Sequence, residues 1–328
     1  MGSTDRLVVC IVTPGTPAAN NGNWRTAARW SELLGDRCEV IVQTEWDGTA
    51  ADVLVALHAR RSAASVRRFA AAHPGRGIGV VLTGTDLYRD LPESTEASAT
   101  LDRADRIVVL QDDALRLLEP RWREKAEVIF QSAPALPRAD KPRDRLECVA
   151  VGHLRVEKDP QTIFAAMRAL PRELPVRLRH IGAPLDEALG AQALALARED
   201  RRYVYEAGMT HGVTRQAMRE AHLLVHPSIM EGGANVIVEA ITAGTAVVAS
   251  RMSGNVGMLG AGYPGYFGTR DASALAGLLV KAWKEPAWRA VLEEECARRA
   301  PLFRPERERQ AVLDLIGALA PVKSPLRP

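Results

Sequence analysis

The stretch from His226 to Ala240, "HPSIMEGGANVIVEA", holds two glutamates with seven residues between them. The apolar run "LLVHPS" leads into it and is typical of a buried strand, whereas the residues after Gly232 and Gly233 follow a helical pattern. Glu231 therefore stands where a strand ends and a helix begins. In open α/β sheets ligands bind at this position, beyond the carboxyl ends of the strands. The stretch thus predicts a fold class and a binding site together.

Short apolar runs alternate with helical patterns along the rest of the chain. Several of the runs are apolar nearly throughout, as expected for parallel strands covered on both faces. This alternation predicts an α/β protein of the doubly wound type, with two tandem Rossmann-like parallel-sheet domains that face a cleft. The predicted strands lie at residues 7–13, 38–44, 53–58, 77–84, 106–111, 126–132, 146–154, 176–182, 203–208, 223–228 and 246–250.

A proline-rich and charged segment divides the two series of strands. We predict an N-terminal Rossmann-like domain at 1–134, a linker at 135–145 and a C-terminal Rossmann-like domain at 146–302. The last part, 303–328, holds one more helical pattern and a tail. That helix could pack on either domain.

Composition narrows the class of protein. The 328 residues are 47% apolar and carry a formal charge of only +3, which does not suggest a nucleic-acid partner. No stretch approaches the roughly 20 apolar residues of a membrane span, and the first apolar run is too short for a signal peptide. We therefore expect a cytoplasmic protein with no membrane partner. The cysteines show no metal-type spacing and are expected to be buried thiols: Cys10, Cys38, Cys148 and Cys296.

The start of the helix after Glu231 is suited to an anion. Gly232 and Gly233 let a ligand approach the backbone, and the free N–H groups of a helix start point toward it. Glu231 itself would repel phosphate, so we expect it to accept hydrogen bonds from neutral hydroxyls. Glu239 follows about two turns later. Two carboxylates beside a phosphate site suit a nucleotide sugar, although a solvated helix face is the alternative interpretation.

The segment "VGHLRVEKDP" offers the cations that such a ligand needs. Arg155 gives a planar fork to phosphate oxygens and Lys158 gives a point charge. Charge-assisted hydrogen bonds of this kind contribute about 1.5–3 kcal/mol each. Taken alone, both residues could be surface charges. Together with the strand, glycine pair and helix described above, they indicate a diphosphate site.

These residues resemble glycosyltransferase family 4, whose members are retaining enzymes with the GT-B fold. Glu231 and Glu239 match the family's Glu-x7-Glu motif. The resemblance implies that Glu231 contacts the sugar hydroxyls, Glu239 the ribose and Lys158 the diphosphate. It implies further binding positions at the backbone of Gly232, Gly233 and Ala234 (phosphate or sugar oxygens) and of Gly208 and Met209 (base).

Three positions depart from the family pattern. The arginine that precedes the family lysine falls on His153, with Arg155 two residues later. A histidine usual in the first domain falls on Thr85, and a later glutamate falls on Gly257. These departures set the acceptor side of this chain apart from an ordinary sugar acceptor site.

A narrower resemblance accounts for them. The blocks "NNGNWRTAARW", "LHARRSAAS", "LTGTDLYRD", "VGHLRVEKDP", "MEGGANVIVEA" and "SGNVGMLG" resemble the selenosugar synthases of selenoneine biosynthesis. These form a carbon–selenium bond between the anomeric carbon of a UDP-sugar, typically UDP-N-acetylglucosamine, and selenophosphate. The resemblance implies release of UDP and phosphate, with the UDP-sugar as substrate, no cofactor and no metal.

A selenophosphate pocket should be basic and rich in N–H donors. His58 ends a predicted strand, Arg60 and Arg61 follow it, and Ser62 is expected to cap the next helix. The alternative is a solvated arginine pair. The other expected acceptor-binding residues are Asn20, Gly22 and Asn23 at a helix start, where a plain capped loop is the alternative, and Thr83 and Thr85 near Asp86, which we expect to be structural.

Other functions stay open at this level. Selenophosphate is anionic and strongly nucleophilic, so positioning can replace a general base, with His58 and His153 as candidate acids or phosphate ligands. The main alternative is a conventional retaining transferase that acts on a small alcohol. A nucleotide-sugar-binding protein without turnover and an epimerase of the same fold are the others.

Overall fold

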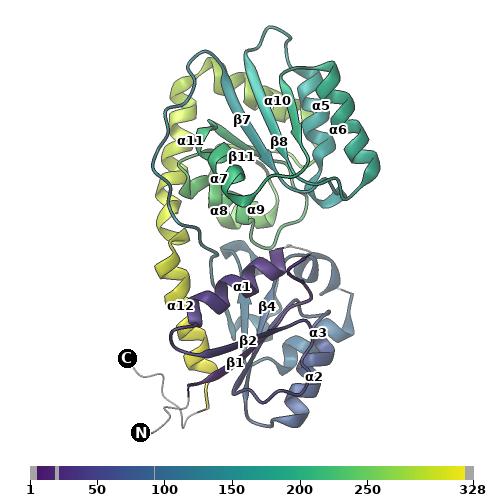
Figure 1. Ribbon diagram of the computed structural model, residues 1–328, viewed down its shortest axis with the longest axis vertical. Coiled ribbons are helices and arrows are strands. Elements are labelled where there is room, and N and C mark those ends of the chain that lie inside the picture. Colours follow the sequence, from purple (N-terminus) through teal and green to yellow (C-terminus); the bar gives the residue numbers. More distant parts are fainter. Residues whose placement is uncertain (1–5, 19–21, 92, 322–328) are drawn as a thin grey trace. The chain divides into compact units, whose positions relative to one another are not determined.

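The computed structural model describes residues 6–18, 22–91 and 93–321, and the chain divides into two compact units (Figure 1). The first unit combines residues 1–131 with 305–328, and the second spans 132–304. Within the described parts of the chain, none of the helices has the length and apolar character needed to cross a bilayer.

The first unit contains a six-stranded, wholly parallel sheet with the order β2-β1-β3-β4-β5-β6. Its strands are β1 (Val8–Val12), β2 (Glu39–Gln43), β3 (Val53–Leu57), β4 (Gly77–Leu82), β5 (Arg106–Val109) and β6 (Ala126–Val128). Its helices are α1 (Gly22–Leu34), α2 (Ala63–Ala72), α3 (Thr95–Arg103), α4 (Pro120–Arg123) and α12 (Pro305–Leu319), with short helical turns η1 (Asp86–Asp90) and η2 (Asp112–Leu117).

Strand β3 shows why the sheet is covered on both faces. All five of its residues are buried. Leu54 and Ala56 join a core with Phe69 of α2, whereas Val53, Val55 and Leu57 join the opposite core, which contains Trp30 of α1. Because successive side chains of a strand point to opposite faces, an all-apolar strand needs helices on both sides.

Helix α12 belongs to the first unit, so segments from the two ends of the chain, purple and yellow in Figure 1, lie side by side there. The buried carboxylate of Glu308 accepts hydrogen bonds from Trp30 Nε1 at 2.9 Å and Arg29 Nε at 2.8 Å. At the other end of the helix, a Cβ on Gly77 would lie 2.1 Å from the Leu319 carbonyl oxygen. Only glycine permits this approach of α12 to β4.

The second unit contains another wholly parallel sheet, with the order β12-β11-β10-β7-β8-β9. Its strands are β7 (Leu146–Val151), β8 (Val176–Ile181), β9 (Tyr203–Glu206), β10 (Leu223–His226), β11 (Ala246–Ser250) and β12 (Tyr266–Phe267). Its helices are α5 (Pro160–Ala169), α6 (Glu187–Glu199), α7 (His211–Glu220), α8 (Asn235–Thr242), α9 (Ser253–Leu259), α10 (Ala272–Lys284) and α11 (Pro286–Arg299), with turns η3 (Val156–Lys158) and η4 (Ala300–Phe303).

These two sheets confirm the predicted doubly wound parallel architecture. Strand β12 has only two residues and was not predicted, because so short a run shows no periodicity. Strands β7 and β10 are paired neighbours, so the loops that follow them leave from the same edge of the sheet.

The four cysteines are buried free thiols, as predicted from their apolar surroundings. Burial raises the pKa of Cys10 to about 12 and that of Cys296 to about 11. They are therefore protonated at neutral pH and are poor nucleophiles.

Candidate functional site

The loops after β7 and β10 bring Lys158 and Glu231 together. Turn η3 follows β7 and ends at Lys158, and the Glu157 carbonyl oxygen in it accepts a 2.9 Å hydrogen bond from the Ile229 amide. That bond ties η3 to the loop after β10. The Lys158 ammonium then donates to the Glu231 carboxylate. The predicted diphosphate cation and the predicted sugar-binding carboxylate thus form one ion pair.

Glu231 is held ionised in this pair. Its side chain is 11% exposed and that of Lys158 19%. Burial alone would raise the pKa of Glu231, but the nearby Lys158 ammonium and His226 hold it well below its usual value. Glu231 is therefore ionised at neutral pH and can accept hydrogen bonds from hydroxyl groups.

His226 is a neighbour of Glu231 that the sequence interpretation did not single out. It is the last residue of β10, is 2% exposed, and its Nε2 lies 3.3 Å from Glu231 Oε1. Burial lowers the pKa of His226, and Lys158 adds to that effect against the pull of Glu231. Its place at the carboxyl end of a strand, next to the motif, was the available signal.

The start of α8 has no side-chain cap. Its N-cap residue is Ala234, which carries no acceptor, so among the described residues no side chain caps the first-turn N–H groups. Neither Gly232 nor Gly233 has a positive φ, so these glycines provide room near the backbone rather than a special turn. An uncapped start of an eight-residue helix beside Lys158 is a place for an anion.

Helix α9 supports the loop that carries Glu231. A Cβ on Gly254 would lie 2.0 Å from the Glu231 carbonyl oxygen. The next residue, Asn255, is fully buried and its Nδ2 donates to the Ser250 carbonyl and hydroxyl oxygens, each at 3.0 Å. Gly257, where the family pattern has a glutamate, lies in the same helix. Its carbonyl oxygen accepts a 2.6 Å hydrogen bond from Arg299, which holds the backbone of α9 although residue 257 has no carboxylate.

Glu239 lies in α8 with its side chain 10% exposed, and its Oε1 is 2.8 Å from His211 Nε2. His211 begins α7, directly after the loop that carries Gly208 and Met209. The imidazole, 58% exposed, was not singled out from the sequence. It links the predicted base-reading loop to the predicted ribose-binding carboxylate.

Arg155 and His153 take different positions. The Arg155 side chain is 48% exposed, with Nε 3.9 Å from Glu157 Oε2. His153 Nδ1 accepts a 3.1 Å hydrogen bond from the Ala183 amide. Within the described residues Arg155 is not brought into the Lys158–Glu231 ion pair.

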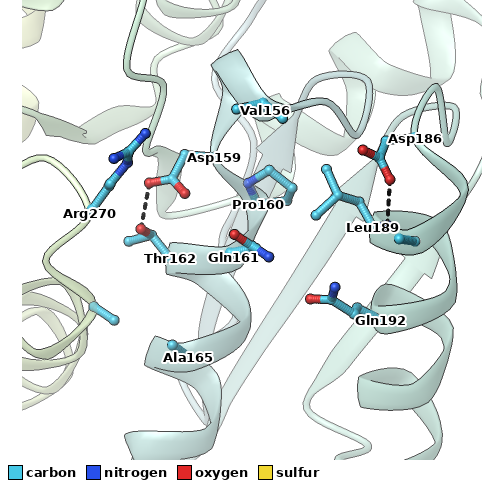
Figure 2. Close-up of a pocket in the computed structure, with 12 residues that line it drawn as sticks. Val156, Asp159, Pro160, Gln161, Thr162, Ala165, Asp186, Leu189, Gln192 and Arg270 are labelled. Atoms are coloured by element: carbon cyan, nitrogen blue, oxygen red, sulfur yellow. Dashed lines mark hydrogen bonds between the residues drawn. The ribbon is translucent and has the colours of Figure 1, made fainter.

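A cavity of about 370 Å³ adjoins η3 on the side of α5 and α6 (Figure 2). Asp159, with φ 47°, accepts from Thr162 Oγ1 at 2.5 Å, and Figure 2 shows Arg270 beside this carboxylate. Asp186 caps α6 by accepting from the Leu189 amide at 3.0 Å. Of the described residues that line this cavity, none was predicted to bind substrate. These contacts fix the start of α5, which follows Lys158, and the start of α6.

The first unit has its own polar cluster, at the ends of β3 and β4. His58 has a φ of 73°, in the left-handed region, and is 1% exposed. The buried Asp86 carboxylate accepts from the backbone amides of Ala59 at 3.0 Å, Thr83 at 2.8 Å and Gly84 at 2.9 Å. Asp86 therefore joins the two loops and has a structural role.

Asp90 was not predicted, yet it organises the predicted acceptor residues. Its Oδ2 lies 3.0 Å from Arg60 Nε and 3.6 Å from His58 Nε2. His58 Nε2 is also 3.0 Å from Thr85 Oγ1. Burial lowers the pKa of His58 against the opposing effect of Asp86, so the imidazole is neutral at pH 7. The signal for Asp90 was its place in "LTGTDLYRD".

The arginines of this cluster outnumber its carboxylates. Arg89 Nε lies 3.7 Å from Asp90 Oδ1, and the Arg61 amide donates to His58 Nδ1 at 3.4 Å. Ser62 takes the predicted N-cap position of α2, but the predicted side-chain cap is wrong: its hydroxyl donates to the Leu57 carbonyl at 2.7 Å and makes no capping bond. The hydroxyl thus donates to the end of β3 instead of accepting from an N–H group of the helix start.

The remaining predicted acceptor residues lie near α1. Gly22 and Asn23 form its first turn, where Thr26 Oγ1 donates to the Gly22 carbonyl at 2.9 Å. Asn20 lies outside the described residues. Thr83 is held through its backbone by Asp86.

Residues 136–300, half of the chain, match the model of the family described as glycosyl transferases group 1. The chain belongs to this family. It is thus a glycosyltransferase, and the region matched contains every residue of the Lys158–Glu231 site. The His58–Asp90 cluster lies outside the match. No match was found among curated protein sequences.

Solved structures of glycosyltransferases share the fold of this family member. Sucrose-phosphate synthase from Thermosynechococcus elongatus is similar with a TM-score of 0.78 at 18% identity, over 95% of this chain and 98% of that one. HepE from Anabaena, solved in complex with UDP, has a TM-score of 0.75 at 15% identity, over 94% and 99%. The two-domain Rossmann-like architecture of GT-B glycosyltransferases is thereby confirmed.

Proposed function

We propose that this glycosyltransferase takes its sugar from a UDP-sugar bound by the second unit. The observation that carries the proposal is the Lys158–Glu231 pair beside the uncapped start of α8. An ammonium and free N–H groups suit a diphosphate, and an ionised carboxylate next to them suits the hydroxyls of the attached sugar. HepE has been solved with UDP-glucose as well as with UDP, which supports this choice of donor.

Each residue then has a role. Lys158 contacts the diphosphate, and Arg155, which is exposed, provides a second cation when the donor binds. Glu231 accepts from the sugar hydroxyls and Glu239 from the ribose. The backbone at Gly232, Gly233 and Ala234 donates to phosphate or sugar oxygens, and the backbone at Gly208 and Met209 contacts the base. The charges of Lys158 and the α8 start stabilise UDP as it leaves, and we expect no metal or cofactor.

For the acceptor we propose selenophosphate, bound by the first unit, so that the enzyme is a selenosugar synthase of selenoneine biosynthesis. The sequence blocks that resemble this group and the excess of arginines around Asp90 support it. Arg60, Arg61, His58, Thr83 and Thr85 form the acceptor site. Gly22 and Asn23 add donors at the start of α1, together with Asn20 of the preceding segment.

The proposed reaction has two steps. A selenium lone pair forms the bond to the anomeric carbon of UDP-N-acetylglucosamine, and the bond from that carbon to the UDP oxygen breaks, so the electron pair leaves with UDP. Water then cleaves the selenium–phosphorus bond and gives phosphate and the selenosugar. Because selenophosphate is already anionic, orientation by the arginines replaces a general base.

A conventional alcohol acceptor is the second candidate, and Asp90 favours it. This buried carboxylate pairs with Arg60 and lies near His58, so it reduces the positive charge available to an anion. A carboxylate and a neutral imidazole at one site can also receive the proton of a hydroxyl.

Two measurements test the proposed donor site and the proposed acceptor separately. Calorimetric titration with UDP should show binding that weakens about tenfold or more in Lys158→Met, because a charge-assisted contact is lost, but not in Arg168→Gln, a charge control at an exposed ion pair. Equal affinities would contradict the donor site.

The acceptor is tested by turnover with selenophosphate. The variant Arg60→Gln/Arg61→Gln should raise the KM for selenophosphate, whereas the exposed Arg67→Gln in α2 should not. Selenium-free turnover with an alcohol, unaffected by these arginines, would favour the second candidate. EDTA should leave the rate unchanged.

A further inference from the structure

A second polar cavity lies in the second unit at the opposite end of its sheet. It measures about 850 Å³ and is formed where the residues before β7 meet the end of α8 and the start of α11. We call it the linker pocket, and its basic lining consists of Arg138, Lys141, Arg143, Arg145, Arg289 and the buried His222.

The linker pocket is separate from the Lys158–Glu231 site. Arg145 directly precedes β7 and His222 directly precedes β10, whereas Lys158 and Glu231 follow the carboxyl ends of the same two strands. A strand rises about 3.3 Å per residue, so the six residues of β7 place the two sites about 20 Å apart. A ligand in one does not reach the other.

The positive charges of the pocket are only partly compensated. Glu147 forms an ion pair with Arg145 at 2.9 Å, and the carboxylates of Asp140 and Glu293 also line the cavity. Among the residues described, Lys141 and Arg289 form no ion pair: they donate to the Gly244 carbonyl at 3.0 Å and the Ala282 carbonyl at 2.9 Å. Carbonyl partners position these cations without neutralising them; burial lowers the pKa of Lys141, and Glu293 is the carboxylate that opposes this effect most strongly.

The pKa of His222 reflects its burial and the positive charge of the linker pocket. It is 5% exposed, and its Nδ1 accepts a 3.0 Å hydrogen bond from the Glu147 amide. Burial, with the positive charges of Arg289 and Lys141, lowers the pKa of His222 to about 4. The imidazole is therefore neutral at pH 7, and the charged lining of the pocket is supplied by arginine and lysine.

We propose that the linker pocket binds a small molecule that carries two or more phosphate groups. Arginine forks and a lysine point charge match phosphate oxygens, and several cations around one cavity favour more than one phosphate. The volume lies in the range of small-molecule sites and exceeds what a single phosphate fills. This site is independent of the proposed donor and acceptor sites.

Inorganic tripolyphosphate is the first probe, titrated calorimetrically into the full-length protein. We expect at least about tenfold weaker binding in Lys141→Gln/Arg289→Gln than in the wild type. The control Arg198→Gln/Arg201→Gln removes the same charge from exposed positions and should bind as the wild type does. Lys158→Met, which removes the contact of the proposed donor site with a diphosphate, should leave tripolyphosphate binding to the linker pocket intact.

A second pocket variant covers the case in which the first fails to fold. Arg138→Gln/Arg143→Gln changes only exposed side chains and should weaken binding in the same direction. A hexose bisphosphate used in parallel distinguishes a carbon-bearing ligand from an inorganic chain, and preference for either supports the proposal. Equal binding in all variants, no binding to the wild type, or loss confined to Lys158→Met would overturn it.

Discussion

Lys158 and Glu231 lie 73 residues apart in the sequence, and their contact depends on two neighbouring parallel strands. Replacing Lys158 by Met leaves Glu231 largely buried without its ammonium partner. We expect the free energy of unfolding to fall by about 1–3 kcal/mol, since both side chains retain some exposure. Urea denaturation measures this.

The double variant Lys158→Met/Glu231→Gln is the matched test of the same pair. Removing the carboxylate charge as well should recover part of the lost stability, because no unpaired ion remains. If the double variant loses the sum of the two single effects, the ion pair does not account for the loss.

Two buried histidines make stability depend on pH. Burial lowers the pKa of His180 and, with nearby cations, that of His222 to about 4, from 6.5. Below pH 6.5 the unfolded chain takes up protons that the folded chain does not, so stability should fall from pH 6.5 toward pH 4. The slope is about 1.4 kcal/mol per pH unit for each histidine.

Urea midpoints measured between pH 7.5 and pH 4.5 check this expectation. The variant His180→Gln/His222→Gln should show a flatter dependence than the wild type, whatever its absolute stability. Equal slopes would mean that other groups cause the acid sensitivity.

At this scale the sequence predicted residue positions better than residue partners. Glu231 and Lys158 follow recognisable strands, so their common edge was predictable. The positions of His226 and Asp90 beside the motifs were a signal, but which side chains His226, His211 and Asp90 contact depends on side-chain directions that no period in the sequence encodes. Ser62 has the predicted N-cap position, but the partner of its hydroxyl is the end of β3 and not the helix.

Helix α9 fixes the loop of Glu231 through the glycine at its second position. The change Gly254→Ala places a Cβ 2.0 Å from the Glu231 carbonyl oxygen, so the loop or the helix must move. We expect at least about a tenfold loss in kcat/KM, since small displacements of a positioned group reduce rates strongly. Steady-state kinetics with the UDP-sugar measures it.

Gly277→Ala is the matched control. Gly277 lies in α10, is exposed, and has open space where the Cβ would be. This change should leave kinetics unaltered and raise stability by about 0.5–1 kcal/mol, as expected for alanine in a helix interior. A similar kinetic loss in both variants would argue against a specific role for Gly254.

The contact between β4 and α12 is also set by a glycine. Gly77→Ala would place a Cβ 2.1 Å from the Leu319 carbonyl oxygen, so the end of α12 must shift away from the sheet. We expect a loss of about 1–3 kcal/mol in the free energy of unfolding, typical of overpacking. Gly75→Ala is unsuitable as a control because its φ of 86° adds strain; Gly277→Ala serves here as well. An unchanged stability would contradict this packing.

For secondary-structure elements, prediction depended on length and burial. Strands such as β3 are buried throughout and appear in the sequence as continuous apolar runs. The two residues of β12 give no such run. The assignment of α12 to the first unit could not be predicted, because an apolar helix face can pack on the core of either unit. The hydrogen bond from Trp30 to Glu308 and the close approach of Leu319 to Gly77 place it on the first.

At the scale of the whole chain, the family match covers one of the two units, whereas the proposed chemistry uses residues of both. The match covers residues 136–300, the second unit almost entirely, and so bears on the donor side. The proposed acceptor side depends on the His58–Asp90 cluster. Its arginines favour an anion, whereas the Asp90 carboxylate favours an alcohol.

The central claim is that this glycosyltransferase joins selenium to the anomeric carbon of a UDP-sugar. Mass spectrometry of the products from purified protein and UDP-N-acetylglucosamine, with and without selenophosphate, tests it most directly. We predict a product of hexosamine size with a selenium isotope pattern, together with an equal amount of UDP, only when selenophosphate is present. UDP-sugar binding with no selenium-containing product would contradict the claim.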